Sequence, residues 1–433
     1  MGYRQPCGAP GQPQGEALNW RHYARTKAEP LKMSIEHDPL REAAYLKQCL
    51  SEDKRPIGFL LAAGCPQSIK DEKGQPLIPA IDALTAGIGL EIAKTDKVDA
   101  YGKVVANLKA DGIAKPNLEK ILTHIRGLLE VAGRGDVRGL DSATLRKLDE
   151  AVCDKIVEAV KRELPKEGTA YRRLASWIQA RERKDPVEIF TPNYDLLFEQ
   201  ALEEHSVPYF DGFVGSRKAF FDTRAMEDDR LPARWARLWK LHGSINWWRT
   251  EGTDGGIAYR GERIGAADRH MIHPSHLKYD ESRRMPYLAM IDRLRSFLRK
   301  PSSVLVCCGY SFGDEHLNAC LDEGLRGNAL GALFALSYGE LETYPDAIKL
   351  AGRLGNFSLF AEDKAVIGTR TGIWMGREES AIQPGGSVAV VWKGGGTKSH
   401  KSAKFTLGDF EAFGGFLAEL MGDAHLTTET DAK

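Results

Sequence analysis

Two short polar turns carry the side chains best suited to chemistry, Thr191-Pro-Asn-Tyr-Asp195 and Leu241-His-Gly-Ser244. Histidine readily takes up a proton near neutral pH, and the glycine and serine after His242 indicate an exposed turn rather than a core position. Simpler interpretations stay open at this point. Asp195 could merely cap a helix, Asn193 could merely form a turn, and a lone histidine is more often a structural hydrogen-bonding group than a base.

The residues around the first turn predict a strand followed by a helix. Apolar Val187, Ile189 and Phe190 end at Pro192, which cannot donate a hydrogen bond within a sheet, and apolar residues recur at helical spacing from Leu197 onward. A polar turn between a parallel strand and a helix lies at the carboxyl edge of an open α/β sheet, where such folds bind ligands. The turn is therefore a candidate site because of its position as well as its composition.

An earlier strand and turn end in small residues. The apolar run that starts at Pro56 predicts a buried first strand, and it leads into Ala62, Ala63, Gly64 and Cys65. Small residues let the backbone approach a phosphate, which amide groups and a following helix terminus can bind. The segment has a single glycine and is not G-x-G-x-x-G, so a close-packed structural turn is an equally good interpretation.

A third strand and turn follow in the second half of the chain. Val304–Cys308 is a continuous buried run, and Gly309-Tyr-Ser-Phe-Gly-Asp314 is the turn after it. Ser311 or Asp314 can cap the next helix, and the same polar groups could hold a ribose or a phosphate. Further strand and helix patterns alternate to about residue 360. This alternation predicts an α/β fold with a doubly wound parallel sheet.

The remaining segments suggest how the chain is divided. Residues 1–36 are rich in glycine and proline and are expected to be a disordered leader, although Met33 is an alternative start. Residues 37–368 are expected to form the main domain, in which amphipathic helices at about 82–183 make up a helical insertion.

Residues 369–433 are expected to form a small C-terminal α+β extension. It has a strand candidate at Ser387–Trp392 and a final helix that is expected to expose Phe413 and Phe416. Its basic loop, 393–404, is interpreted as a solvated hairpin turn, with a nucleic-acid or partner contact as the alternative.

Composition narrows the class of protein. The 60 basic and 60 acidic residues cancel, which disfavours direct nucleic-acid binding and membrane-surface binding as global properties. The seven cysteines include no C-x-x-C pair, which argues against a disulfide framework and for a cytoplasmic protein. No apolar run approaches the ~18 residues of a membrane span. His270, His273 and His276 do not share a helix face because Pro274 intervenes, so we expect no metal site.

Taken together and in this order, the motifs resemble those of the sirtuin-like superfamily. Leu60–Cys65, Thr191–Asp195 with Leu241–Ser244, and Gly309–Asp314 are similar to its bacterial branch of antiphage-defence NADases, of the Thoeris type or associated with HerA. Ile272–Lys278 is similar to the I-x-P stretch of the same branch. The resemblance implies a Rossmann-like fold and NAD as the substrate, with cleavage of the bond between nicotinamide and ribose.

The resemblance also implies roles for individual residues. Asn193 would contact the nicotinamide ribose and position the attacking water, and His242 would be the general base. The residues that would contact other parts of NAD are Ala62, Ala63, Gly64 and Cys65 near the pyrophosphate, Gly309, Tyr310, Ser311 and Asp314 on the adenosine side, and Asp195. The implied partners are NAD, further copies of the chain in a homo-oligomer, and a HerA-like hexameric ATPase, because the chain has no G-x-x-x-x-G-K-[ST] motif of its own.

Three departures from the deacylase pattern favour hydrolysis. Ala62 stands where deacylases have a first glycine, and Pro66 replaces a small polar residue. Ile78-Pro-Ala80 lacks the acidic residue and the arginine of the family's I-P-D-F-R loop, for which Asp82 is a weak substitute, and the four-cysteine zinc module is missing. The alternatives are an NAD-dependent deacylase or ADP-ribosyltransferase, and a non-catalytic module that binds NAD or ADP-ribose as a scaffold for an ATPase.

Overall fold

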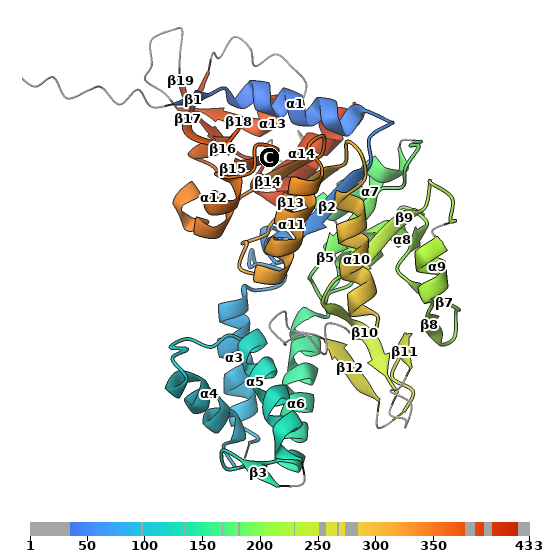
Figure 1. The fold of residues 1–433 in the computed structure, drawn as a ribbon, viewed down its shortest axis with the longest axis vertical. Coiled ribbons are helices and arrows are strands. Elements are labelled where there is room, and N and C mark those ends of the chain that lie inside the picture. Colours follow the sequence, from blue (N-terminus) through green and yellow to red (C-terminus); the bar gives the residue numbers. More distant parts are fainter. Residues whose placement is uncertain are drawn as a thin grey trace, which may run out of the picture. The chain divides into compact units, whose positions relative to one another are not determined.

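The computed structural model describes residues 35–422, apart from 97, 134, 167, 181, 229, 251–256, 266–267, 273–284, 377–385 and 394–400. These residues belong to the unit of the chain that begins at Ile35 (Figure 1). The predicted leader, 1–36, lies outside the described residues except for Ile35 and Glu36.

The centre of the fold is a parallel sheet built from short apolar runs. β2 (Ile57–Leu61) and β13 (Val304–Cys308) lie side by side in parallel, and every residue of both strands is buried. Strands buried on both faces require helices on both sides of the sheet. The parallel strands follow the order β15-β14-β13-β2-β5-β9-β6. The bounds of the other five are β5 Glu188–Thr191, β6 Tyr209–Phe210, β9 Ala236–Lys240, β14 Ala332–Leu336 and β15 Phe357–Phe360.

Alternate side chains of these strands enter two separate cores. Phe59 and Leu61 of β2 pack into one core and Leu60 into the other, because successive side chains of a strand point to opposite faces. Helices α1, α7, α8 and α14 cover the first face, and α10, α11 and α12 cover the second (Figure 1). Their bounds are α1 Pro39–Ser51, α7 Ala170–Gln179, α8 Leu197–Glu204, α10 Tyr287–Leu298, α11 Glu315–Gly327, α12 Pro345–Ala351 and α14 Phe410–Met421.

The chain reverses its direction across the sheet between β2 and β13. From β2 it proceeds to β5 and β9 on one side, and it then returns to β13 on the other side of β2 before it continues to β14 and β15. This is the connectivity of a doubly wound sheet, so the predicted fold class is confirmed. In such folds the ligand crevice lies outside the carboxyl ends of the strands at the point of reversal.

Antiparallel strands extend the sheet beyond β15. β16 (Lys364–Ile367) and β17 (Arg370–Gly376) continue it, followed by β19 (Lys401–Phe405) and β18 (Val390–Trp392), and β1 (Glu36–His37) pairs with β17. The strand predicted at Ser387–Trp392 begins instead with a helical turn, α13 (Gly386–Ala389), which leads into β18. Most of the basic loop lies outside the described residues.

The expectation that the last helix exposes two phenylalanines is wrong. Phe413 is 0% and Phe416 1% exposed, and both belong to the first core. Phe413 lies with its ring centroid 6.2 Å from that of Phe59 on β2. Gly414, next to it, lets the helix approach α7 closely, since an added Cβ would lie 2.6 Å from Ala170 Cα. The final helix therefore covers the sheet rather than presenting a contact surface.

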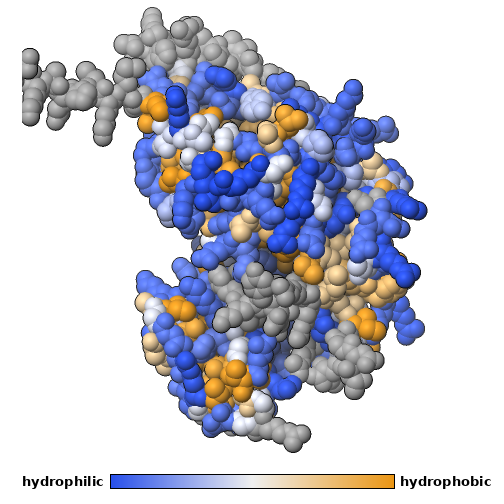
Figure 2. All heavy atoms as spheres, viewed as in Figure 1, coloured by the Kyte–Doolittle hydropathy of each residue, from blue (hydrophilic) through white to orange (hydrophobic). Residues whose placement is uncertain are grey.

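Among the described residues, five helices (α2 to α6) lie between β2 and α7, and α3 to α6 occupy most of the predicted helical insertion. Asn117 caps α5 by accepting from Lys120 N, and Asp141 caps α6 by accepting from Thr144 N. Figure 2 shows a mostly hydrophilic face, with a smaller hydrophobic patch over these helices. The bounds in this region are α2 Gly64–Ser68, α3 Ile81–Ala93, α4 Ala100–Ala110, α5 Leu118–Ala132, α6 Ser142–Val160, and the hairpin β3 Asp136–Val137 with β4 Leu140–Asp141.

A second, antiparallel sheet has the order β12-β10-β11-β8-β7. Arg126 of α5 joins the helices to this sheet, because its guanidinium donates to Ile272 O at 2.9 Å and pairs with Asp149 at 2.8 Å. The bounds are β7 Phe213–Val214, β8 Ala219–Phe221, α9 Thr223–Asp228, β10 Gly243–Arg249, β11 Ala258–Arg260 and β12 Arg269–Ile272. No helix in the described part of the chain is both long enough and apolar enough to cross a membrane.

Candidate functional site

His242 and Asp314 meet above the carboxyl ends of the strands. His242 lies between β9 and β10, two residues after the end of β9, and Asp314 is the N-cap of α11 after the turn that follows β13. Their Nε2 and Oδ2 atoms are 3.1 Å apart, and the two side chains are only 12% and 10% exposed. Burial alone would raise the pKa of Asp314, but His242 and the backbone N–H groups of Leu317 and His316 outweigh burial and hold that pKa below its usual value.

Asn193 lies in the turn after β5 and reaches the neighbouring turn after β2. Its side-chain amide donates to Ala62 O at 3.2 Å, and its own backbone N–H donates to Thr191 Oγ1 at 3.1 Å. The amide Oδ1 can still accept a hydrogen bond from a ligand or a water molecule. The side chain is thus held at the strand ends while its acceptor is available.

The turns after β2 and β13 pack backbone against backbone at the point where the sheet reverses. Gly64 N donates to Gly309 O at 2.9 Å, and a Cβ added to Gly64 would lie 2.6 Å from Gly309 Cα. Gly309 has φ +64°, and a Cβ there would lie 2.5 Å from Cys65 N. Both glycines are therefore required by the mutual contact of the two turns, which supports the close-packed interpretation of this segment.

The predicted NAD-contacting residues differ in accessibility. Ala62, Cys65 and Tyr310 are 3%, 0% and 7% exposed, so their side chains belong to the core. Ala63 and Ser311 are exposed at the surface of the two turns. A ligand can meet the backbone of the first turn and the hydroxyl of Ser311 without any rearrangement of the buried side chains.

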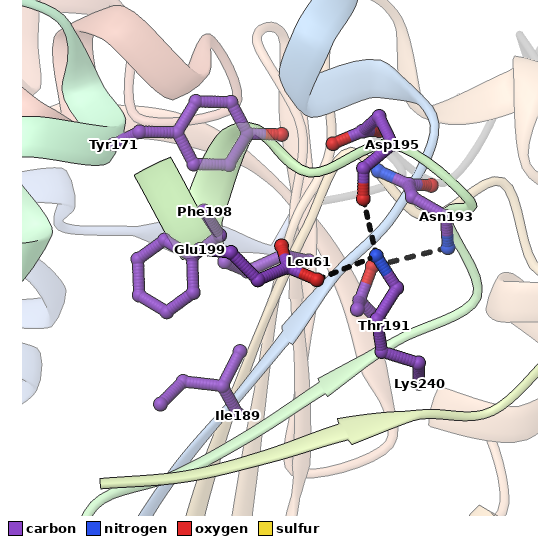
Figure 3. A pocket seen from close by; sticks show the side chains of 9 residues that line it. All are labelled: Leu61, Tyr171, Ile189, Thr191, Asn193, Asp195, Phe198, Glu199 and Lys240. Atoms are coloured by element: carbon purple, nitrogen blue, oxygen red, sulfur yellow. Dashed lines mark hydrogen bonds and ion pairs between the residues drawn. The ribbon is translucent and has the colours of Figure 1, made fainter. Parts of the chain in front are cut away.

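Beneath the Asn193 turn lies a buried cluster of charges (Figure 3). Lys240 is 2% exposed at its side chain, and its ammonium group pairs with Glu199 at 3.0 Å and donates to Asp195 O. Burial, opposed by Lys240 and aided by Glu199, raises the pKa of Asp195 to about 6. These residues line a pocket together with Leu61, Tyr171, Ile189, Thr191, Asn193 and Phe198.

Asp195 contributes a hydrogen bond at the start of α8, although the N-cap residue of this helix is Leu196 rather than Asp195. Its Oδ1 accepts from Leu197 N at 3.1 Å, at the start of α8, and the residue is 6% exposed. The dashed line from Lys240 in Figure 3 reaches Asp195 at its backbone carbonyl oxygen. None of these contacts involves His242 or Asp314, so the predicted role of Asp195 in NAD binding stays a prediction.

Lys240 and Glu199 were not predicted from the sequence. A lysine within the apolar run Leu238-Trp-Lys-Leu241 is the signal that could have revealed them, because a lone charge in a buried strand requires a partner. Glu199 follows Asp195 by four residues and so lies on the same side of the helix start.

The histidine group considered as a metal site is only partly within the described residues. His270 pairs with Asp154 at 3.0 Å, whereas His273 and His276 lie outside them. Across the described ranges, no group of three or more histidine, cysteine, aspartate or glutamate side chains is arranged to hold a metal ion.

The strand-end turns are thus joined to one another. The β2 turn contacts the β5 turn through Asn193 and the β13 turn through the two glycines, while the β9 turn contacts the β13 turn through His242 and Asp314. Residues 187–352 match the SIR2-like domain. The SIR2-like domain as matched runs from β5 to the end of α12, so it contains Asn193, His242 and Asp314 but not the β2 turn.

Three solved structures of Sir2 enzymes or sirtuins are distant matches. A structure concerning the mechanism and regulation of Sir2 enzymes is 11% identical and covers 69% of this chain and 86% of its own, with a TM-score of 0.32. A structure concerning sirtuin substrate affinity is 13% identical and covers 67% and 85%, with a TM-score of 0.31. A structure of a Sir2 variant with a p53 peptide and NAD is 11% identical, with a TM-score of 0.28. The match covers 69% of this chain and 86% of the Sir2 chain. No curated protein matches the sequence.

Proposed function

We propose that this protein is an NAD glycohydrolase that splits NAD into nicotinamide and ADP-ribose. The observation that carries the proposal is the placement of Asn193 and His242 at the carboxyl ends of adjacent strands, β5 and β9, within a SIR2-like domain. Their turns lie beside the point where the sheet reverses, which is where doubly wound folds bind nucleotides. One of the matched Sir2 structures is described as containing NAD.

The residues present suit the proposed reaction. As the bond from C1′ of the ribose to the nicotinamide nitrogen breaks, the electron pair leaves with nicotinamide and an oxocarbenium-like ribose develops. Asn193 Oδ1 accepts a hydrogen bond from the attacking water or a ribose hydroxyl, and His242 accepts the water's proton. The water oxygen forms the new bond to C1′, and the products are nicotinamide, ADP-ribose and one proton.

Hydrolysis is favoured over deacylation by what surrounds these residues. The chain lacks the four-cysteine module that shapes a peptide groove in deacylases, and the six described cysteines are all buried. The segment at Ile78-Pro-Ala80 also lacks the acidic residue and the arginine of the deacylase loop. An NAD-dependent deacylase or ADP-ribosyltransferase is the alternative, since both chemistries begin with cleavage of the same bond.

We further propose a biological setting consistent with the sequence resemblance. Hydrolysis of NAD without an acceptor would deplete the nucleotide, which suits an effector of antiphage defence in the cytoplasm. The protein would then act as a homo-oligomer and with a separate HerA-like ATPase. A non-catalytic scaffold that binds NAD or ADP-ribose for such a partner is the competing proposal.

The test is to incubate purified protein with NAD and follow free nicotinamide and ADP-ribose by NMR or chromatography, with and without an acetyl-lysine peptide. Equal amounts of both products without peptide would support hydrolysis. Product that forms only with peptide, together with acylated ADP-ribose, would establish deacylation instead. Tight NAD binding without any product would contradict unassisted hydrolysis and favour the scaffold.

A further inference from the structure

We infer that Asp314 is a positioning residue for His242, fixing the ring so that Nδ1 is the atom that accepts the proton, rather than a ligand of the adenosine ribose. The inference rests on the proposed function for its catalytic consequence, but the arrangement itself belongs to the protein without NAD. The inference gives the turn after β13 a role in the reaction, which the sequence did not suggest.

The contact between His242 and Asp314 joins the ends of two strands that are not adjacent. β9 and β13 are not neighbours, because β5 and β2 lie between them. Three inter-strand spacings separate strands by about 14 Å. For His242 Nε2 and Asp314 Oδ2 to lie 3.1 Å apart, the turns after β9 and β13 must lean toward each other over the ends of the two middle strands. Adjacent strands do not bring these side chains together, so the contact depends on the conformations of the turns.

The Asp314 carboxylate is held through one oxygen, and its other oxygen lies beside His242. Its Oδ1 accepts from His316 N at 2.9 Å and from Leu317 N at 3.2 Å. Its Oδ2 is buried and makes no hydrogen bond with the described residues, and His242 Nε2 lies 3.1 Å from it. A buried carboxylate oxygen without a partner is costly, so the imidazole N–H is the group expected to satisfy it.

The turn before Asp314 is fixed by its packing against the core. Phe312 has φ +59° and is 1% exposed, and its ring packs 4.5 Å from that of Tyr310. The Tyr310 hydroxyl is 2.9 Å from Asn318 Oδ1, and the Asn318 amide donates to Phe312 O at 2.7 Å. A non-glycine residue persists in this backbone region only where the surroundings impose it, so the turn is tightly held.

The chemical consequence follows from which nitrogen faces Asp314. With Nε2–H directed at the carboxylate, Nδ1 carries the lone pair and is the proton acceptor. When the water oxygen bonds to C1′ and the electron pair departs with nicotinamide, the water's proton moves to Nδ1. The imidazolium that forms is stabilised by the Asp314 carboxylate 3.1 Å from Nε2.

The test is Asp314→Asn, which keeps a good N-cap for α11 but removes the negative charge. Nitrogen-15 NMR of labelled histidine, with the His242 signals assigned by their loss in His242→Gln, gives the ring tautomer without NAD. We expect the Nε2–H form in the unaltered protein and a mixture in Asp314→Asn. We also expect the kcat for NAD to fall about 10²–10⁴-fold, with KM within about threefold.

The control is Asp38→Asn, because Asp38 caps α1 by the same pattern, through Leu40 N and Arg41 N, far from the strand-end turns. Neither tautomer nor kcat should change in this variant. Asp314→Ser, which also retains a cap, replaces Asp314→Asn if that variant does not fold. An unchanged tautomer, or a raised KM with kcat unaffected, would overturn the inference. A changed tautomer in a protein that never cleaves NAD would uphold the positioning and refute only the proposed function.

Discussion

The turns at the carboxyl edge of the sheet are built in different ways on its two sides. On the side of β2 and β13, Gly64 and Gly309 bring two backbones into direct contact, with 2.9 Å between N and O. On the side of β5 and β9, the turn that carries Asn193 rests on a buried group of charges, formed by Lys240, Glu199 and Asp195. We call the first the backbone side and the second the charged side.

The turns at one edge of the sheet are therefore held in place by two kinds of interaction, backbone contact on one side and buried ion pairing on the other. On the backbone side the two turns are in close contact, so the stability of the protein should fall when side-chain volume is added there. It should change little with pH. On the charged side the turn depends on ionised groups that pair in the protein interior. The stability of the protein should therefore change when one of these charges is removed and when the pH changes. Each contrast can be measured with single substitutions.

The largest effect is expected on the charged side from Lys240→Met. The substitution leaves Glu199 without its partner, and loss of one member of a buried ion pair typically costs about 3–5 kcal/mol. Chemical denaturation would measure the fall in the free energy of unfolding. The double variant Lys240→Met with Glu199→Gln should recover a large part of the loss. A loss below about 1 kcal/mol in the single variant would mean that the pair does not support the turn.

The next largest effect is expected from Asp195, whose carboxyl group should make the stability of the protein depend on pH. Its pKa is about 6 in the folded protein, above the value of about 3.9 expected when unfolded. The folded state therefore holds a proton that the unfolded state releases, so the carboxyl group contributes stability below about pH 4 and loses it as the pH rises through about 6. Between pH 4 and pH 8, the free energy of unfolding of Asp195→Asn should therefore rise relative to that of the unaltered protein, by up to about 3 kcal/mol.

Denaturation curves for both proteins at these two pH values would check this expectation. A stability difference that stays constant with pH, or that moves against the variant as the pH rises, would show that Asp195 is not held in its neutral form by burial.

The smallest effect is expected on the backbone side, from Gly64→Ala. The new Cβ would meet Gly309 Cα at 2.6 Å, and forcing such a contact costs about 1–3 kcal/mol. Gly87→Ala is the matched control, because Gly87 lies within α3 and an added Cβ there would have nothing within 4 Å. Alanine at that helical position should stabilise by about 0.5–1 kcal/mol. Thermal unfolding of the two variants should therefore shift in opposite directions, and a shift in the same direction would contradict the steric account.

Much of the fold follows from local patterns in the sequence. The buried runs at β2, β5 and β13, and the glycine, proline and asparagine turns after them, can be recognised because each pattern is continuous along the chain. The connectivity follows from their alternation with helices. These features also locate Asn193 and His242 at strand ends before any contact is known.

Contacts between distant segments could not be predicted in this way. The pairing of His242 with Asp314 depends on two turns that lean over intervening strands, which no local pattern encodes. The burial of Lys240 depends on Glu199 from another element, and a lysine by itself suggests an exposed face. Phe413 and Phe416 were misassigned because an apolar helix at the end of a chain does not reveal that it covers a sheet.

Cleavage of NAD by Asn193 and His242 is tested by the initial rate of nicotinamide release in three proteins of matched fold. We expect release by the unaltered protein and a fall of about 10²–10⁴-fold in His242→Ala and in Asn193→Ala, with unfolding midpoints preserved. Rates in either variant within about threefold of the unaltered protein would contradict this expectation.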